Sequence, residues 1–359
     1  MTTVANQIGA RVYLRPVGFV AGHLAARAIR DGRACALAGG PVAFTHVERI
    51  TRDHRELVPV TDLDNETLLP LVRTRAALAL PDGHALDLSA PIMFGIVNVT
   101  PDSFSDGGLH ASPEQSLIHG RALVSAGAHV VDVGGESTRP GADPVDGDEE
   151  RRRVLPVIGA LAGEGAVVSV DTRRAATMKA AIRAGAAIIN DVTALTFDPE
   201  SAAVAAQSRA PVVLMHARGE PRTMQQDPRY EDVVLDVYDA LAQRVDQAVA
   251  AGIDRCQIIV DPGIGFGKTL AHNLALLGAI GIFHGLGCAV MLGASRKSLI
   301  GRIANEDVAA RRMPGSLALA VMARMQGVQI FRVHDVAETV QALAVAEALL
   351  TDGSGPTPH

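Results

Sequence analysis

The sequence predicts a (β/α)8 barrel (an α/β TIM barrel) that carries a small N-terminal α/β extension. Between Pro91 and Leu350, short apolar runs alternate with stretches whose apolar residues have helical spacing. There are eight such runs, and this alternation indicates parallel strands joined by right-handed crossovers. Eight units in about 260 residues match the usual length of such a barrel.

The eight expected strands are short and apolar. They are Ile92–Val97, His129–Val133, Val167–Val170, Ala187–Ile189, Val212–Met215, Gln257–Val260, Ala289–Leu292 and Gln329–Phe331. Four of the intervening helices are expected to end at a left-handed glycine cap directly before a strand, at Gly127, Gly185, Gly252 and Gly327. The alternative fold is an open doubly wound sheet. It requires a glycine-rich dinucleotide turn after the first strand, and the turn at 98–103 is not of that kind.

The N-terminal residues have a different pattern, and none of them forms a cluster of chemical groups. The expected elements are a short strand at Val12–Leu14, a helix at Ala21–Arg30, a hairpin of Ala34–Leu37 with Val42–Ile50, a helix at Asn65–Ala77 and a second hairpin at Ala79–Leu88. We therefore divide the chain into an extension of unknown role (1–78), a barrel (79–350) and a flexible tail (351–359).

Composition and charge narrow the function classes. The net charge is -6 and there is no basic block, which disfavours a nucleic-acid partner. No apolar run approaches ~20 residues, so no membrane span is expected. The three cysteines lack metal-site spacing, and the N-terminus lacks the apolar segment of a secretion signal. These features favour a protein of the reducing cytoplasm.

Polar side chains follow all eight expected strands. They are Asn98, Asp132, Asp171, Asn190 with Asp191, His216, Asp261, the group Ser295–Lys297, and Arg332 with His334 and Asp335. Barrel enzymes build their sites at the C-terminal ends of the strands. The pattern therefore predicts one pocket to which all eight strands contribute.

Three of these residues match a flat heterocycle. Asp171 and Asp261 offer carboxylates to adjacent N–H donors, and Asn190 offers a mixed donor and acceptor edge. A pterin-like or guanine-like ring has this pattern of groups. The alternative is that one of the acids forms a structural ion pair with Lys297 or Arg332.

Another set suits an anionic group. Arg139, Arg332 and His334 are suited to phosphates or a carboxylate, and Asn98 to the phosphates or a cation that accompanies them. The stretch Gly263–Thr269 ends like a phosphate-binding loop, but Pro262 stands where the first glycine of that motif is required.

The remaining candidates have an ordinary structural alternative. The glycines of 263–269 are expected to let a flat ring approach, with Phe266 packed on it. Met215 fits either the core or the wall of the ring pocket. His216 is expected to be structural, because a single histidine in a polar loop indicates little.

Taken in order, the motifs resemble those of the dihydropteroate synthase family. The matching stretches are NVTPDSFSDGG, DVGGESTRPGA, VDTR, INDV, LMHARGEPRTMQ, DPGIGFGK, GASRKS and FRVHD, and the resemblance covers Ala79 to Leu350. The resemblance implies a (β/α)8 barrel that joins 6-hydroxymethyl-7,8-dihydropterin diphosphate to 4-aminobenzoate in folate synthesis, releasing diphosphate. It also implies a cytosolic homodimer that needs Mg2+ and is sensitive to sulfonamides.

The resemblance also implies roles for single residues. Asp171, Asn190, Asp261 and Lys297 would contact the pterin ring. Asn98, Arg332 and His334 would bind the diphosphate, with Asn98 as a Mg2+ ligand, while Ser298 would contact the carboxylate of 4-aminobenzoate. Phe104 and Asp106 would belong to one mobile loop, and Thr138 and Arg139 to another. The expected catalytic residues are Asp106, which would stabilise a pterin cation, together with Lys297, Arg332 and His334.

Two other functions are compatible with such a barrel. A pterin-dependent methyltransferase shares the ring pocket, but has no use for the ESTRPG, SRKS and FRVHD groups. A non-catalytic paralogue would not need polar groups at all eight strand ends. The extension is the departure from the family pattern. It is too short for a second folate enzyme, so we expect an appendage that packs on the barrel or helps the dimer.

Overall fold

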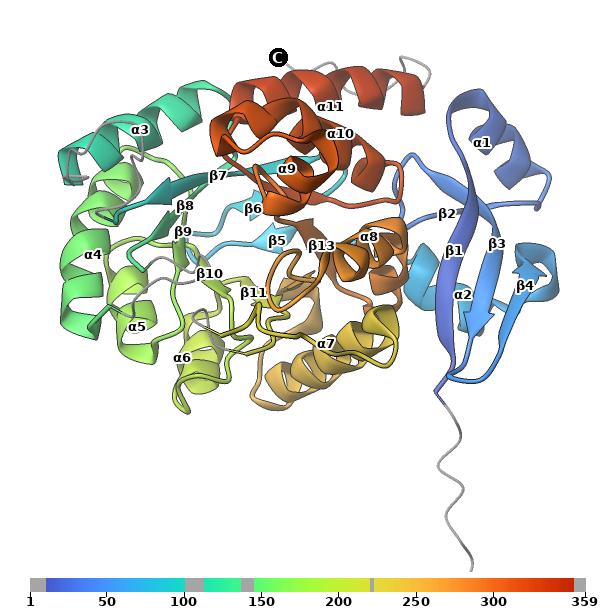
Figure 1. Cartoon of the computed structure of the whole chain (residues 1–359), viewed down its shortest axis with the longest axis horizontal. Coiled ribbons are helices and arrows are strands. Elements are labelled where there is room, and N and C mark those ends of the chain that lie inside the picture. The colour runs from blue at the N-terminus through green and yellow to red at the C-terminus, as the bar shows by residue number, and fades with distance from the viewer. Residues whose placement is uncertain (1–10, 101–112, 137–144, 220–222, 352–359) are drawn as a thin grey trace, which may run out of the picture.

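The computed structural model describes residues 11–100, 113–136, 145–219 and 223–351. Eight parallel strands form a closed barrel at its centre (Figure 1). They are β7 (Ile92–Asn98), β8 (Val130–Gly134), β9 (Val168–Asp171), β10 (Ile188–Asp191), β11 (Val212–Met215), β12 (Ile258–Asp261), β13 (Ala289–Leu292) and β14 (Ile330–Val333). All eight expected strands are therefore confirmed, and β14 closes the barrel by pairing with β7.

Helices surround the barrel on its outside (Figure 1). They are α3 (Pro113–Ser125), α4 (Gly147–Gly163), α5 (Ala175–Arg183), α6 (Ser201–Ser208), α7 (Val233–Ala250), α8 (Leu270–Gly278), α9 (Ser298–Ala304), α10 (Met313–Arg324) and α11 (Val336–Leu350), with 3-10 turns η2 (Arg255–Gln257), η3 (Ile280–Leu286) and η4 (Ala309–Arg312). The four expected glycine caps are confirmed, since all four have φ between 81° and 108°. Within the described ranges, no helix is both long and apolar enough to span a membrane.

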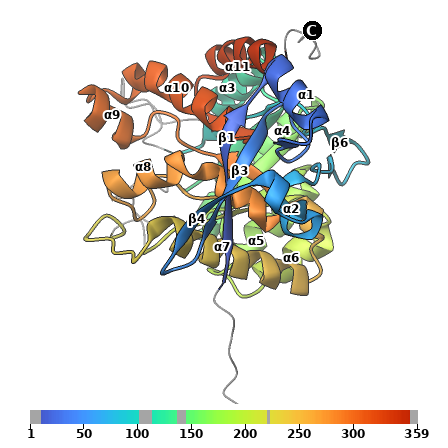
Figure 2. The same ribbon diagram turned by 90° about the vertical axis from the view of Figure 1, so that its right-hand side faces the viewer.

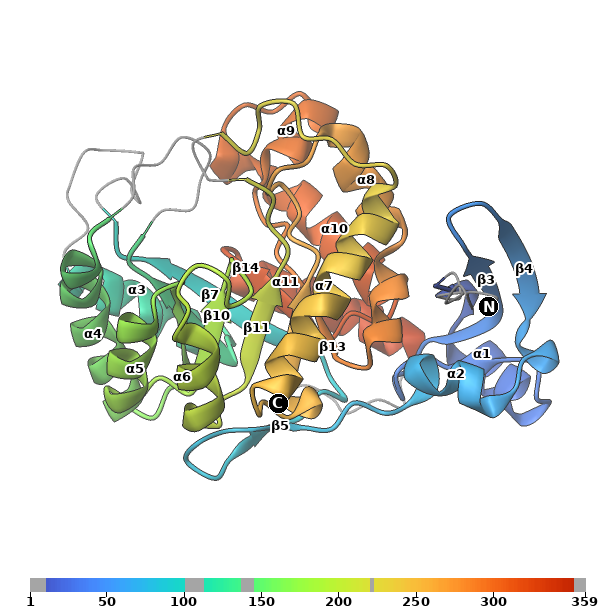
Figure 3. The same cartoon turned by 90° about the horizontal axis from the view of Figure 1, so that it is seen from below.

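A short hairpin closes the N-terminal end of the barrel. Strands β5 (Leu78–Ala79) and β6 (Ala85–Leu86) lie below the barrel strands in the view of Figure 3. Leucines of this hairpin pack on an apolar layer inside the barrel. The layer includes Val130, Ile188, Val213, Ile259 and Ile330. This end of the barrel is a packed core, which leaves the opposite end for a ligand.

A separate antiparallel sheet lies beside the barrel (Figure 1), and it faces the viewer in Figure 2. We call it the N-terminal sheet; it consists of β1 (Tyr13–Val20), β2 (Cys35–Ala36), β3 (Ala43–Ile50) and β4 (Arg55–Pro59), and it is accompanied by α1 (Gly22–Arg30), η1 (Val60–Asp62) and α2 (Asn65–Val72). The β2–β3 hairpin and α1 match the expected elements, and α2 begins at Asn65 as expected.

Two boundaries in this region were predicted wrongly. The first strand extends to Val20, although Pro16 and Gly18 interrupt its pattern, because β1 is at the edge of the sheet and an edge strand tolerates proline. The second helix ends at Val72 rather than near residue 77. Just beyond its end, the side chain of Arg75 donates to the carbonyl of His284 at 2.8 Å, so a contact with the barrel replaces the last helical turn.

The N-terminal sheet and the barrel share part of one core. Tyr13 and Ile50 are buried in the same apolar cluster as the barrel strands and their helices. The ring of Tyr13 meets that of Tyr238, on α7, edge to face with a centroid distance of 5.3 Å. Apolar packing therefore fixes where the sheet lies on the barrel.

Candidate active site

The predicted pocket residues lie at the C-terminal end of the barrel interior. Side chains alternate along a strand, so residues two positions apart face the same side. Four polar residues and one methionine lie two positions after members of the apolar layer described above: Asp132, Asn190, Asp261, Arg332 and Met215. The same alternation that builds the core therefore places these five side chains above it.

Arg332 joins two acids at the centre of the site. Its Nε donates to Asp132 at 2.6 Å and its Nη2 donates to Asp171 at 2.8 Å. The same oxygen of Asp132 also accepts a 3.1 Å hydrogen bond from the amide of Asn190. Its other oxygen, Oδ1, is buried without a protein partner. The cluster therefore contains one buried acceptor, Asp132 Oδ1, whose hydrogen-bonding capacity is unused within the protein.

Burial sets the electrostatics of this cluster. It raises the pKa of Asp171 above its ordinary value, and the neighbouring carboxylate of Asp132 adds to the increase while Arg332 opposes it. Two carboxylates share one guanidinium, so one negative charge lacks a balancing cation within the cluster. Such a site favours a ligand that brings N–H donors or positive charge.

Asp261 supplies a second carboxylate on the same side of the barrel. Its Oδ1 accepts a 2.7 Å hydrogen bond from the backbone N–H of Gly263, and burial raises its pKa. A Cβ at Gly293 would lie 3.3 Å from its Oδ2, so glycine leaves the space beside this oxygen open. Met215 is paired with Asp261 across the β11–β12 register and is buried.

Lys297 and Phe266 form a pair beside these acids. The Nζ of Lys297 lies 4.2 Å from the centre of the Phe266 ring and donates to the carbonyl of Ile264. Burial lowers the pKa of Lys297 to about 8, although the charge of Asp261 opposes that change. Gly265 has a φ of 87°, and a Cβ there would lie 3.2 Å from the Lys297 stem. Glycine at this position thus permits the lysine to lie close to the loop.

The remaining described candidates lie around this centre. The Nδ1 of His334 lies 3.0 Å from Ser295 Oγ. The same hydroxyl oxygen accepts a hydrogen bond from the backbone N–H of His334. Asn98 is half-buried at the end of β7, and Ser298 is exposed as the first residue of α9. Asp106, Thr138 and Arg139 were also predicted for the site; they lie outside the described residues, as does Phe104.

Two contacts qualify the sequence-based interpretation. Asp171 does form an ion pair with Arg332, which was the alternative considered for one of the acids. His216, which was expected to be structural, has its Nδ1 2.9 Å from the Nζ of Lys268. Burial lowers the pKa of His216 to about 3 and that of Lys268 to about 7. This pair therefore joins the loops after β11 and β12.

Sequence reasoning gave no role to Asp132, which the structure places at the centre of the cluster. Its position after a strand was noticed, but the residue lies inside β8 and is fully buried. The signal that would have revealed it is a charged residue within an otherwise apolar strand, since a buried charge requires a partner.

Comparisons with known proteins agree with this geometry. The family described as Pterin binding enzyme matches residues 94–334. The dihydropteroate synthase of Escherichia coli K12 is 46% identical over 270 residues, which are 75% of this chain and 95% of that protein.

Solved structures show the same likeness. The Yersinia pestis dihydropteroate synthase in complex with a sulfonamide drug has a TM-score of 0.73 and 46% identity, covering 76% of this chain and 98% of that one. The Xanthomonas albilineans dihydropteroate synthase in complex with 7,8-dihydropteroate has a TM-score of 0.70 and 41% identity, and the match covers 78% of this chain and 100% of that one.

Proposed function

We propose how individual residues carry out the reaction of the family to which this chain belongs, the dihydropteroate synthases among the pterin-binding enzymes. The chain condenses 6-hydroxymethyl-7,8-dihydropterin diphosphate with 4-aminobenzoate, giving 7,8-dihydropteroate and diphosphate in folate synthesis. The assignment of single residues is supported chiefly by the buried cluster of Arg332 with Asp132 and Asp171 beside Asn190.

The pterin ring is proposed to lie across this cluster. Asp171 and Asn190 would face one edge of the ring, and Asp261 would accept from its 2-amino group and N3. Lys297 would donate to the carbonyl side, because its Nζ already lies near Asp261 and the Phe266 ring. Phe266 and Met215 would contact the faces of the ring. Each polar group would then exchange a protein or solvent contact for one with the ligand.

Charge supports a cationic intermediate on the pterin. Loss of diphosphate leaves positive charge on the methylene carbon, delocalised into the ring. The described pocket contains three carboxylates and two cationic side chains, an excess of negative charge that stabilises such a cation. Asp106 is proposed to contribute from its loop. The arylamine is weakly basic, so it needs correct placement more than a strong base.

The leaving diphosphate is proposed to bind at the rim. We assign it to the Nη1 group of Arg332, to His334 and to Arg139. Ser298, exposed at the start of α9, would contact the carboxylate of 4-aminobenzoate together with Thr138. Removal of water by the surrounding loops would protect the cation from hydrolysis.

Mg2+ is the proposed cofactor, with Asn98 as its protein ligand. The described residues contain no group of three or more His, Cys, Asp or Glu that would hold a metal by themselves. Mg2+ commonly uses only one or two protein oxygens together with waters and substrate phosphates, and the half-buried Asn98 amide fits that donor set. When bound, the ion neutralises charge on the leaving diphosphate. Asn98→Ala should raise the Mg2+ concentration needed for half-maximal activity, and an unchanged requirement would exclude Asn98 as a ligand.

A homodimer is proposed to form through α10 and α11. Met322, Val345 and Leu349 are large apolar side chains exposed near the C-terminal ends of these helices. Arg324 donates to Glu347 at 2.5 Å, and this contact holds the C-terminal ends of α10 and α11 side by side. The exposed apolar side chains on these ends are the reason for proposing an interface there. Sedimentation of the wild type and of Leu349→Glu tests the surface; a monomeric wild type would overturn the proposal.

Two further expectations concern the environment and inhibition. Cys35, Cys256 and Cys288 are unpaired, which fits the reducing cytoplasm where we place the reaction. Because the Yersinia pestis synthase is described with a sulfonamide drug, we propose that sulfonamides compete with 4-aminobenzoate here as well. Competition kinetics at several arylamine concentrations will test this.

A direct assay tests the function as a whole. The protein is mixed with pterin diphosphate, 4-aminobenzoate and Mg2+, and diphosphate release is measured. Release should depend on the arylamine, so the matched control omits it. Absence of arylamine-dependent release would overturn the assigned reaction.

A further inference from the structure

The N-terminal sheet contacts the barrel through an arginine in the turn between β3 and β4. Arg52 donates to Asp236 at 2.6 Å and to Asp239 at 2.7 Å. Both acids lie in the first two turns of α7, and the hydroxyl of Tyr13 also donates to Asp239 at 2.7 Å. The beginning of α7 is therefore attached to the sheet by charged and polar groups.

These contacts involve the residues that determine where α7 begins. Arg55, on β4, donates to Oδ2 of Asp232 at 2.8 Å. The other oxygen of Asp232 caps α7 by accepting from two backbone N–H groups of its first turn, at 3.0 and 3.2 Å. Asp236, the partner of Arg52, accepts from the backbone N–H of Glu231 at 3.0 Å. The sheet thus holds the two acids that fix the junction between α7 and the loop before it.

That loop contacts the substrate pocket. Within its described part, residues 223–232, Tyr230 donates to the carbonyl of Gly267 at 2.9 Å and Gln225 donates to that of Gly265 at 2.5 Å. Both glycines belong to the loop after β12, which holds the side chain of Lys297 through the Ile264 carbonyl. Hydrogen bonds and short chain segments therefore connect the N-terminal sheet to Lys297.

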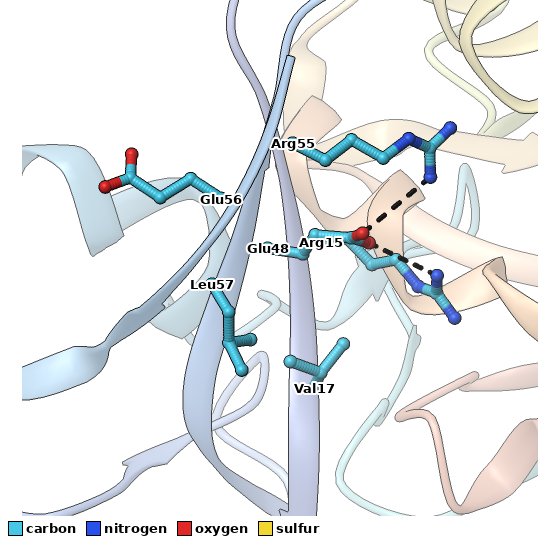
Figure 4. A pocket seen from close by; sticks show the side chains of 6 residues that line it. All are labelled: Arg15, Val17, Glu48, Arg55, Glu56 and Leu57. Carbon is cyan, nitrogen blue, oxygen red and sulfur yellow. Dashed lines mark hydrogen bonds and ion pairs between the residues drawn. The ribbon is translucent and has the colours of Figure 1, made fainter.

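The region between the sheet and the barrel is not tightly packed at this contact. A hollow of about 340 Å³ lies there, lined by Arg15 and Arg55 of the sheet and by residues of α7 and α8. A second hollow, of about 390 Å³, is lined by the same two arginines and other residues of the sheet alone. Figure 4 shows Glu48 between these two arginines, with ion pairs of 3.3 and 3.7 Å. Because the 340 Å³ hollow interrupts the packing here, the long charged side chains add to the apolar contact that Tyr13 makes with Tyr238 on α7.

We propose that the N-terminal sheet positions loop 223–232, and through it the loop that holds Lys297, with Arg52 and Arg55 as the positioning residues. This inference rests on the proposed function, since it assigns a role in pterin binding to residues outside the pocket. It also assigns a structural role, the positioning of this loop, to the N-terminal extension. The Escherichia coli relative is matched over 95% of its own length by 75% of this chain, so little of it remains to form a comparable sheet.

The test removes both charges and compares two matched variants. Arg52→Gln with Arg55→Gln removes the ion pairs to Asp232, Asp236 and Asp239. Arg49→Gln removes an ion pair confined to the sheet, Arg49 with Glu56 at 3.7 Å. Arg52→Lys with Arg55→Lys restores the charges. Backbone amide exchange of residues 223–235 is measured in the full-length protein, together with kcat and KM for pterin diphosphate.

The double glutamine variant should show at least tenfold faster exchange at residues 231–235. It should also raise KM for pterin diphosphate about fivefold, with kcat within twofold of the wild type, because the ring site is displaced rather than lost. The lysine variant should recover most of both effects, and Arg49→Gln should show neither. Unchanged exchange, or faster exchange with unchanged KM, would overturn the proposal.

A second measurement needs no variant. Exchange at residues 231–235 of the wild type should increase between low and high salt more than exchange in the β5–β6 hairpin, because partly exposed ion pairs are screened. Equal salt effects in the two segments would count against the proposal even if the double variant does not fold. A wild type that is inactive would refute the proposed function, while the exchange data would still decide whether the sheet holds the loop.

Discussion

Two clusters in this protein have the same chemistry and nearly the same geometry. In the barrel, Arg332 donates to Asp132 and Asp171 at 2.6 and 2.8 Å. At the N-terminal sheet, Arg52 donates to Asp236 and Asp239 at 2.6 and 2.7 Å. The side chains differ in exposure. In the barrel cluster the arginine is 22% exposed and the two acids are 0% and 9% exposed. At the sheet the arginine is 35% exposed and the two acids are 22% and 34% exposed.

Burial, rather than distance, separates the roles of the two clusters. An exposed ion pair is screened by water and salt and usually contributes ~0–1 kcal/mol to stability. Removal of one partner from a buried cluster leaves an uncompensated charge and typically costs about 3–5 kcal/mol. Loss of one charge should therefore disturb the barrel cluster strongly. Loss of one charge from the sheet cluster should cost little stability, because water and salt can compensate for it.

The largest effect is expected for Arg332→Met. It leaves the carboxylates of Asp132 and Asp171 buried without their cation and removes a group proposed for diphosphate departure. We expect kcat/KM to fall at least ~1,000-fold, about 4 kcal/mol in the transition state. Stopped assays of diphosphate release will measure the loss. Arg52→Met is the matched control, and a comparable loss in that variant would contradict the distinction between the clusters.

Substitutions of Lys297 test whether a partly buried cation is essential for turnover. Lys297→Ala should reduce turnover at least ~10-fold, about 1.4 kcal/mol. Since burial lowers the pKa of Lys297 to about 8, its charged form is lost as the pH rises through that value, and kcat/KM for pterin diphosphate should fall there. Lys297→Arg keeps its charge and should remove that fall. Unchanged turnover in the alanine variant would exclude Lys297 from the site.

A smaller effect is expected for Asp132→Asn, which keeps the shape of the side chain and removes its charge. The pKa of Asp171 should move down, because the neighbouring like charge that raises it is gone. Activity should fall roughly 10-fold, since Arg332 is held less firmly. Carboxyl resonances followed by NMR against pH will report the shift. A pKa that stays in place would mean that burial alone determines the behaviour of Asp171.

The smallest effect is expected for the stability of Arg52→Met. Its unfolding free energy should decrease by no more than about 1 kcal/mol at low salt, and the difference should shrink in 1 M salt. Denaturant titrations at two salt concentrations will measure it. A loss of several kcal/mol that persists in high salt would show that the sheet cluster behaves like the buried one.

Much of the fold was predictable because its signals are local. Each barrel strand is buried on both faces, which requires a continuous apolar run, and each helix before a glycine cap ends where the left-handed residue stands. The errors in the N-terminal region have tertiary causes. Pro16 is tolerated only because β1 is an edge strand, and the helix before Arg75 ends where that side chain binds the barrel.

The sequence by itself determined which residues converge, because parallel strands bring their C-terminal ends together in any barrel. Asp171, Asn190, Asp261 and Arg332 were predicted for one pocket on that basis. Only the tertiary structure decided how they are paired. Asp132 and Arg332 are 200 residues apart in sequence, and closure of the barrel through β14 and β7 brings them within 2.6 Å. The attachment of the N-terminal sheet to α7 has the same origin, because an ion pair between distant segments leaves no periodic pattern in the sequence.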